Sequence, residues 1–453
     1  MTSVRGDEQG LAQEVLARAA KERVRFVNLQ FVDIVGLVKS VTIPTHELED
    51  CIRHGKWFDG SSIEGFARIA ESDMYLKPDL STFAVIPWER AEGATGRLIC
   101  WVYTPNGEPF PGDPRYVLQR ALREVEDLGY DFHVGPEFEF FVLKPDGSGE
   151  LQAPAQDQAG YFDLSTDVSV HLRRDVVNAL EDLGIPVEAS HHETAAGQHE
   201  IDLKYDTALK AADNAVTLKY TAKAVAQRHG LFASFMPKPF LGVAGSGMHI
   251  HQSFFRRGTR ANAFYNEDDR YGLSEMGKHF IAGQLHHARG LCAIVSPLIN
   301  SYKRLVPGYE APVYISWARI NRSALIRIPK FSPGNPEATR VELRCPDPSC
   351  NPYLAFAAML KCGLDGIRRE LPLPPPIEEN LFQFDRKRLK QQEVLLLPSS
   401  LGEALEEMQR DNVVQEALGE HAYQRFLEAK QMEWDDYRKQ VTPWEVAHYL
   451  PFY

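Results

Sequence analysis

The sequence predicts an α+β fold in which helices flank an antiparallel sheet with one polar face. Several stretches space their apolar residues as amphipathic helices do. Four other stretches alternate polar and apolar residues with the period of a strand, and each would present acids, histidines or arginines on one face. This pattern favours a single sheet with a polar inner surface. The four stretches are 135–141, 198–203, 248–251 and 340–344.

The N-terminal part of the chain predicts a small unit of strands and two helices. Asp33 and Gly36 suit a turn between two strands. A run rich in proline and glycine at 105–114 then separates this unit from the rest, so we expect domains at 1–106 and 107–453. The expected elements are a helix over 11–24, one or two strands within 26–41, a capped helix over 45–54, a loop over 56–65 and a strand over 97–103.

The larger part predicts alternating strands and long helices. Asp113 and Pro114 suit the cap and first turn of a helix that leads into the strand 135–141. Small residues at 194–197 favour a loop joining two strand ends, and Asp206 suits the cap of a long helix. The expected elements are helices over 114–128, 165–183 and 207–229, a charged flap over 300–311, and helices within 349–371 and 401–441.

The strand 135–141 carries the most informative pattern. Its period places Glu137 and Glu139 on one face and Phe138 and Phe140 on the other. With the phenylalanines buried, the two carboxylates would repel each other and resist desolvation unless a cation lay between them. For one such pair, an edge strand with its acidic face in water is the common alternative. Recurrence of the pattern in three further stretches favours a metal site instead.

The candidate ligands are mostly hard oxygen donors without sulfur, which favours Mg²⁺ or Mn²⁺ over zinc. For His249 alone, a satisfied core histidine is the alternative. Arg319, Arg322 and Arg327 suit anion binding, although surface ion pairs are an equal alternative for any single arginine. Carboxylates for two ions beside arginines indicate an ATP-dependent transferase, ligase or phosphohydrolase. The candidate ligands are Glu137, Glu139, Glu193, Glu200, His249 and Glu342.

Composition and charge argue against several other classes of protein. The 453 residues carry a formal net charge of −12 and no basic stripe, which argues against a general nucleic-acid binder. The longest apolar runs are too short to span a membrane and the polar start is no signal peptide, so we expect no membrane partner and a cytoplasmic location. The six cysteines contain no Cys-x-x-Cys pair and fit reduced, mostly buried thiols.

Seven motifs carry a family resemblance: WFDGSSIEGFARIAESD (57–73), GPEFEFF (135–141), HHETAAGQHE (191–200), GSGMHIH (245–251), RLVPGYEAP (304–312), NRSALIRIP (321–329) and RVELRCPDPSCNPY (340–353). With them the chain resembles type I glutamine synthetases over essentially its full length. The resemblance implies a small β-grasp-like N-terminal domain, a larger catalytic domain, and a homo-dodecamer of two stacked rings with active sites shared between neighbouring subunits. It also implies L-glutamate, ammonium and ATP as substrates, with two or more Mg²⁺ or Mn²⁺ ions per subunit.

The same resemblance implies roles for individual residues. The implied ligands are Glu139, Glu193 and Glu200 for one ion and Glu137, His249 and Glu342 for the other. The implied glutamate contacts are Gly245, Arg304, Glu310 and Arg344. The implied nucleotide contacts are Glu188, His251, Ser253, Arg322 and Arg327, of which Arg322 would also stabilise the transferred phosphoryl group. The implied ammonium site is Asp59 of the adjacent subunit with Tyr161 and the flap residue Glu310.

Two departures from the family pattern and two regulatory features stand out. Ala244 replaces the usual asparagine before Gly-Ser-Gly, which puts one contact to the substrate amino group in doubt, and Ile320 marks a branch difference. Phe382 stands where the adenylylated branch has tyrosine, so we expect no adenylylation. Arg68 and Glu433 resemble residues of the branch that is inhibited by its product glutamine.

Two rival functions remain to be weighed. A γ-glutamyl-polyamine or -amine ligase of the same superfamily would share most motifs, but Asp59 and Glu310 suit a small cation better than a bulky amine. A non-catalytic, regulator-binding relative would have no reason to keep so many mutually repelling carboxylates. The sequence therefore favours glutamate–ammonia ligation.

Overall fold

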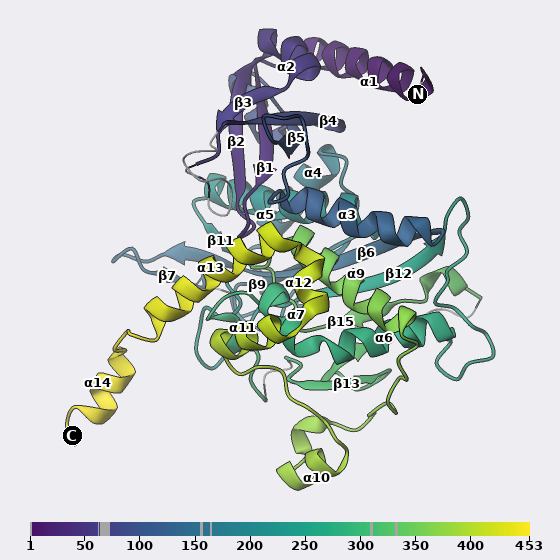
Figure 1. The fold of residues 1–453 in the computed structure, drawn as a ribbon. Coiled ribbons are helices and arrows are strands. Elements are labelled where there is room, and N and C mark those ends of the chain that lie inside the picture. The colour runs from purple at the N-terminus through teal and green to yellow at the C-terminus, as the bar shows by residue number, and fades with distance from the viewer. Residues whose placement is uncertain are drawn as a thin grey trace.

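The computed structural model describes residues 2–61, 63, 73–154, 157–163, 165–308, 311–330 and 334–453. Two sheets organise the chain, a five-stranded sheet in the N-terminal part and a ten-stranded sheet in the remainder (Figure 1). Helices pack against both sheets, so the predicted α+β fold is confirmed. No helix within the described ranges is long and apolar enough to cross a membrane.

The N-terminal unit contains α1 Thr2–Lys21, β1 Phe26–Val32, β2 Val38–Pro44, α2 Leu48–His54, β3 Lys56–Asp59, β4 Asp73–Val85 and β5 Thr95–Tyr103. The strand order of its sheet is β2-β1-β5-β4-β3, with β1 parallel to β5 and the other neighbours antiparallel. The turn between β1 and β2 forms because Gly36 adopts a φ of 90° and the Asp33 carboxylate accepts a hydrogen bond from the Leu37 amide at 2.8 Å. The unit has its own hydrophobic core.

The structure of this unit differs from the sequence-based prediction in three elements. The stretch 56–65, expected to be a loop, begins with β3, because Trp57 and Phe58 pack on Tyr75 and Phe31 with ring centroids 5.3 and 5.0 Å apart. Strand β4, the partner of β3, was not predicted at all. Helix α1 also begins well before the first apolar residues that revealed it. Tertiary pairing overrides turn-like composition here.

The larger sheet has the strand order β13-β14-β15-β12-β6-β9-β8, with three short strands also pairing with β6. All four predicted strand stretches lie in it. Its pairs are antiparallel except β13–β14, which are parallel, so the expectation of a purely antiparallel sheet fails at that edge. The strands are β6 Tyr130–Pro145, β7 Leu151–Gln152, β8 Val187–His192, β9 Gln198–Leu203, β10 Asp206–Thr207, β11 Phe232–Ser234, β12 Met248–Arg256, β13 Tyr314–Ala318, β14 Ala324–Arg327 and β15 Val341–Leu343.

The helices of this part are α3 Pro114–Asp127, α4 Val170–Asp182, α5 Ala208–Arg228, α6 Glu275–His286, α7 Ala288–Val295, α8 Ser301–Arg304, α9 Pro352–Arg368, α10 Arg386–Gln391, α11 Leu401–Arg410, α12 Asn412–Leu418, α13 Glu420–Tyr437 and α14 Pro443–Tyr449. Asp113 caps α3 as predicted. Asp206 does not cap α5; it pairs in β10 and binds Lys210 at 2.9 Å. The stretch 401–441 forms three helices, because Asp411 caps α12 and Gly419 has a φ of 78°.

The alternation of β6 separates a core face from a polar face, as predicted. Phe138 and Phe140 are fully buried in the main core, which includes residues of α3 and α5. Both helices pack against β6 (Figure 1). Glu137 and Glu139 consequently lie on the opposite face, where β9 and β12 flank them. Burial of two phenylalanines, worth about 1.5–3 kcal/mol each, fixes the direction in which the carboxylates point.

A buried ionic network joins the two sheets. The Arg115 guanidinium on α3 donates to Asp213 on α5 at 2.9 and 2.8 Å and to Asp79 on β4 at 2.8 Å. It also lies 3.9 Å from the centroid of Trp101 on β5. The Tyr353 hydroxyl on α9 donates to the same aspartate at 2.6 Å. The N-terminal sheet is therefore anchored to the helices that support β6.

All six cysteines are buried and free, as expected.

Candidate active site

Strand register gathers the predicted metal ligands on one face of the larger sheet. Glu137 on β6 lies directly opposite His249 on β12, and Glu139 lies opposite Glu200 on β9. On the far side of β12, His251 lies opposite Glu342 on β15. Directly opposed residues in an antiparallel pair have Cβ atoms about 4.5–5.5 Å apart. Pairing alone therefore brings together side chains that are distant in sequence.

Glu137, His249 and Glu342 form one compact group. Each offers one ligand atom, and these atoms all lie within 4.8 Å of one another. The Glu137 carboxylate lies 3.1 Å from His249 Nδ1 and 2.6 Å from His251 Nε2. Burial pushes the pKa of Glu137 upward, but the adjacent His251 and His249 outweigh it and hold that pKa below its usual value. The group can bind a divalent cation through oxygen and imidazole nitrogen.

Glu342 is the most enclosed member of this group. It is only 1% exposed, and its carboxylate lies 2.5 Å from Arg327 Nε and 3.2 Å from Arg344 Nε. Burial opposes ionisation, yet His251, His249 and the two arginines keep the pKa of Glu342 below its usual value. These arginines place positive charge at the rim of the group, where an anionic ligand could also contact them.

Glu139, Glu193 and Glu200 meet as repelling carboxyls. Burial, and then the charge of Glu193, raise the pKa of Glu139 to about 8, while burial and the charge of Glu139 raise that of Glu200 to about 9. The Glu139 carboxylate accepts a hydrogen bond from the Gly247 amide at 2.9 Å. Among the described residues, Glu200 belongs to a group with His191 and Asp202, in which the ligand atoms all lie within 4.8 Å of one another. A divalent cation would compensate this repulsion, so the donor set fits such an ion.

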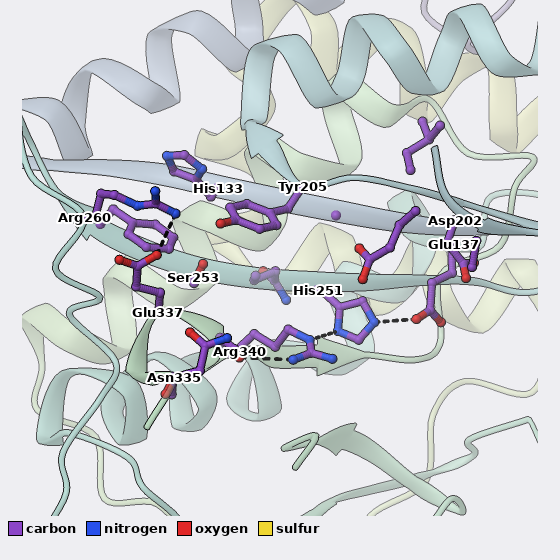
Figure 2. Close-up of a pocket in the computed structure, with 18 residues that line it drawn as sticks. His133, Glu137, Asp202, Tyr205, His251, Ser253, Arg260, Asn335, Glu337 and Arg340 are labelled. Atoms are coloured by element: carbon purple, nitrogen blue, oxygen red, sulfur yellow. Dashed lines mark hydrogen bonds and ion pairs between the residues drawn. The ribbon is translucent and has the colours of Figure 1, made fainter. Parts of the chain in front are cut away.

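A cavity of about 380 Å³ opens beside Glu137 and Asp202. Glu188, His251 and Ser253, which the sequence assigned to the nucleotide, all line it, together with Glu137. Figure 2 shows Arg340 reaching across the cavity wall to His251, and its Nε donates to His251 Nδ1 at 3.2 Å. The sequence did not identify the remaining polar residues of the wall, because their positions depend on strand register and on loops: His133, Asp202, Tyr205, Gln252, Arg260, Asn335, Glu337, Thr339 and Arg340.

The turn before β12 is pressed against Arg304. A Cβ atom on Gly247 would lie 2.4 Å from Arg304 Nη2, and one on Gly245 would lie 2.4 Å from the Pro237 carbonyl oxygen, so glycine is required at both positions. Arg304 is 4% exposed and its guanidinium donates to the carbonyls of residues 344, 345 and 346 at 2.9–3.3 Å. Arg344 donates to the Arg322 carbonyl. Gly245, Arg304 and Arg344, three of the four predicted glutamate-binding residues, therefore lie next to one another.

The other predicted residues are more scattered. Asp59 ends β3 in the N-terminal sheet, where its exposed carboxylate accepts the Ser61 amide at 2.8 Å. Tyr161 is 46% exposed and packs edge-to-face with His191, with ring centroids 5.4 Å apart. Glu433 lies on α13 and binds Lys430 at 2.9 Å. Glu310 and Arg68 lie outside the described residues.

Known proteins match the chain along nearly its whole length. Residues 23–105 match the family model "Glutamine synthetase, beta-Grasp domain" and residues 111–449 match "Glutamine synthetase, catalytic domain". Proteins named glutamine synthetase from Thermotoga maritima and Thermus thermophilus are 53% and 51% identical over 95% and 97% of this chain and 97% and 99% of theirs. One from Clostridium saccharobutylicum is 49% identical over 97% of this chain and 99% of its own.

A solved structure described as "GmaS/ADP complex-Conformation 1" superposes with a TM-score of 0.85 at 33% identity and covers 96% of this chain and 99% of its own. A second, "Apo GmaS without ligand", superposes equally well at 32% identity over the same shares of both chains. Together with the matching domain models and the carboxylate-lined sheet, these likenesses establish that this chain belongs to the glutamine synthetase family.

Proposed function

We propose that this protein ligates ammonium to the side-chain carboxylate of L-glutamate at the expense of ATP, giving glutamine, ADP and phosphate. Family membership implies these three substrates and the use of a divalent metal. The observation that carries the proposal is the convergence of Glu137, His249 and Glu342 beside a cavity lined by Glu188, His251 and Ser253. Hard ligands next to a nucleotide-sized cavity suit phosphoryl transfer.

Two metal ions, Mg²⁺ or Mn²⁺, fit the donor set. Glu139, Glu193 and Glu200 would hold one, and Glu137, His249 and Glu342 the other. The raised pKa values of Glu139 and Glu200 support the first assignment, because burial and mutual repulsion there favour a bound cation. Bound ions would neutralise the charge of the phosphates and of the carboxylates around them.

The chain's own residues would orient the reactants. Arg304, Arg344 and the backbone of Gly245 would bind glutamate so that an oxygen of its side-chain carboxylate attacks the γ-phosphorus of ATP and ADP leaves. Arg322 and Arg327 would stabilise the charge of the transferred phosphoryl group. The product of this step, γ-glutamyl phosphate, then reacts with ammonia at its carbonyl carbon, and phosphate leaves. Closure of the flap 300–311 would exclude water during this interval.

Ammonium would bind at Asp59 of an adjacent subunit, next to Tyr161 and Glu310. A carboxylate attracts the cation and then accepts a proton as ammonia attacks. Asp59 suits this role because its carboxylate is exposed at the edge of the N-terminal sheet. Such a shared site requires an oligomer, for which we propose the homo-dodecamer. The projecting C-terminal segment that contains α14 supports assembly, because Trp444, Leu450 and Phe452 in this segment are 58–78% exposed (Figure 1).

We further propose a domain boundary near residue 106, a cytoplasmic location, and control by glutamine rather than by adenylylation. The N-terminal sheet and the larger sheet have separate cores, which supports the boundary. Phe382 lies in a short 3₁₀ turn and offers no hydroxyl to modify. Arg68 and Glu433 would act in glutamine inhibition. An amine-ligase function is less well supported, because the chain is 49–53% identical over nearly its whole length to proteins named glutamine synthetase.

The first test is the reaction itself. Phosphate release from ATP with Mg²⁺ and glutamate should depend on ammonium and should not be supported by spermidine or methylamine. Asp59→Asn should lower kcat by about 100-fold or more, because it removes the proposed proton acceptor. Asp73→Asn is the matched control, since Asp73 lies directly opposite Asp59 across β3–β4. Equal rates with methylamine would identify the amine ligase instead.

A second prediction concerns metal-free stability. Glu139→Gln should raise the thermal midpoint of the metal-free protein near pH 7. Burial and the charge of Glu193 raise the pKa of Glu139 to about 8, so folding at this pH must add a proton to the carboxyl, whereas glutamine needs none. The substitution should also abolish most of the midpoint increase that Mn²⁺ gives the parent protein. Differential scanning calorimetry with and without Mn²⁺ measures both. In the control Glu124→Gln, loss of the pairs to Lys361 and Arg368 should lower the midpoint and leave the Mn²⁺ effect intact. A metal-free Glu139→Gln protein less stable than its parent would contradict the repulsion.

A third prediction concerns Ala244. Ala244→Asn should lower the KM for glutamate by roughly tenfold with little change in kcat, since one hydrogen bond to a charged group contributes about 1.5 kcal/mol. Steady-state kinetics with varied glutamate measures this, and Ala244→Val controls for side-chain size. An unchanged KM would show that the amino group is bound elsewhere.

A fourth prediction concerns regulation. Glutamine should inhibit the parent enzyme, and Glu433→Gln should raise the glutamine concentration needed for half inhibition while leaving kcat near the parent value. Glu428→Gln on the same helix is the control, since Glu428 forms an ion pair with Arg425 at 2.6 Å. Activity that glutamine leaves unaltered in the parent would refute this form of control.

A further inference from the structure

The turn between β8 and β9 holds two of the proposed metal ligands. Glu193 directly follows β8 and Glu200 lies on β9, so the path of the turn decides how far apart their carboxylates lie. Gly197 closes the turn with a φ of 72°, and a Cβ atom there would lie 2.8 Å from the Val142 carbonyl oxygen. The turn is thus wedged against β6 with no space for adjustment on that side.

Asp157 holds the opposite side of this turn. Its carboxylate accepts a hydrogen bond from the Gly197 amide at 2.9 Å and one from the Ala159 amide at 3.2 Å. It also lies 3.2 Å from His192 Nε2. Asp157 is 4% exposed and His192 is 1% exposed, so these bonds form in a dry environment, where each is expensive to lose.

His192 extends the contact to the first residue of the turn. Its Nδ1 lies 2.6 Å from the Glu193 carbonyl oxygen. The Asp157 carboxylate accepts a hydrogen bond from the Gly197 amide at the end of the turn, and through the His192 imidazole it is linked to Glu193 at the start. It therefore fixes both ends of the turn.

The same residues do not form a further metal site. Asp157, His192 and His199 offer ligand atoms within 4.8 Å of one another, which is metal-like spacing. However, Arg173 Nη1 lies 2.9 Å from His199 Nδ1, and an arginine can only donate. His199 Nδ1 is then the acceptor and the ring hydrogen sits on Nε2, which has no lone pair left for a metal. The cluster is a hydrogen-bond network behind the metal face.

We propose that Asp157 is a positioning residue that holds Glu193 and Glu200 at the spacing required for one divalent cation. The proposal rests on the assignment of these two glutamates as ligands under the proposed function. Residues that orient metal ligands from behind commonly change metal affinity by about 10- to 100-fold when replaced. Asp157 has the geometry for this role because it contacts the backbone that carries the ligands and not the ion.

The test is the affinity of the full-length, metal-free protein for Mn²⁺ alone, measured by electron paramagnetic resonance of free Mn²⁺ without ATP or glutamate. Asp157→Asn keeps the size of the side chain but turns an amide towards the backbone donors, and it should weaken binding at one of the two sites by about 10- to 100-fold. Asp157→Glu should recover part of the loss. Asp146→Asn is the matched control, because Asp146 also accepts backbone amides, from Ser148 and Glu150, in the exposed β6–β7 turn.

The outcomes separate this proposal from the assignment beneath it. A parent protein that binds no Mn²⁺ contradicts the metal ligands themselves. A parent that binds two ions, with Asp157→Asn binding both within twofold of the parent, overturns the positioning role alone. Should Asp157→Asn fail to fold, His192→Gln tests the same link, since glutamine cannot span Asp157 and the Glu193 carbonyl as the imidazole does. Unchanged Mn²⁺ affinity in that variant is equally contradictory.

Discussion

Repulsion between carboxylates on one strand face is the constraint on which this structure depends. Glu137 and Glu139 cannot turn away from each other, because Phe138 and Phe140 hold β6 from the core side. Register then adds Glu200 from β9 and, through β12, the group around Glu342. The packing that stabilises the fold also holds several carboxyl groups close together, which makes their ionisation unfavourable. A bound divalent cation would compensate their negative charge.

The two halves of the acidic face handle this charge differently. Around Glu137 and Glu342, neighbouring histidines and arginines lower the pKa of both carboxyl groups and so favour their ionised form. Around Glu139 and Glu200 no such cations dominate, and the pKa values rise to about 8 and 9. Under the proposed assignment, the second half would depend on bound metal more strongly than the first. The fold would then be less stable without metal, a trade-off common at active sites.

Much of the fold and of the acidic face could be predicted from sequence, because both depend on patterns within short stretches of the chain. Alternation within one strand shows which residues share a face, so Glu137, Glu139, His249 and Glu342 could be assigned to one polar surface. Helices with strong apolar spacing, such as α3 and α5, were also predictable. The motifs then linked the surface to a family, which the domain matches confirm.

What sequence could not supply depends on register and packing. Asp202 lines the cavity because β9 pairs with β6 in one particular register, and Arg340 lines it because β15, which it directly precedes, pairs with β12. Asp157 lies outside every motif, and its importance appears only when the turn at Gly197 folds over it. Strand β3 was mistaken for a loop because its partner β4 provides the pairing that its own composition does not suggest.

The most direct test of the central claim is anomalous diffraction at the manganese edge from crystals grown with Mn²⁺ and a non-hydrolysable ATP analogue. The account predicts two manganese peaks per subunit, one among Glu139, Glu193 and Glu200 and one among Glu137, His249 and Glu342, with the nucleotide in the adjoining cavity. Peaks elsewhere, or no peak on this face of the sheet while the nucleotide is bound, would contradict it.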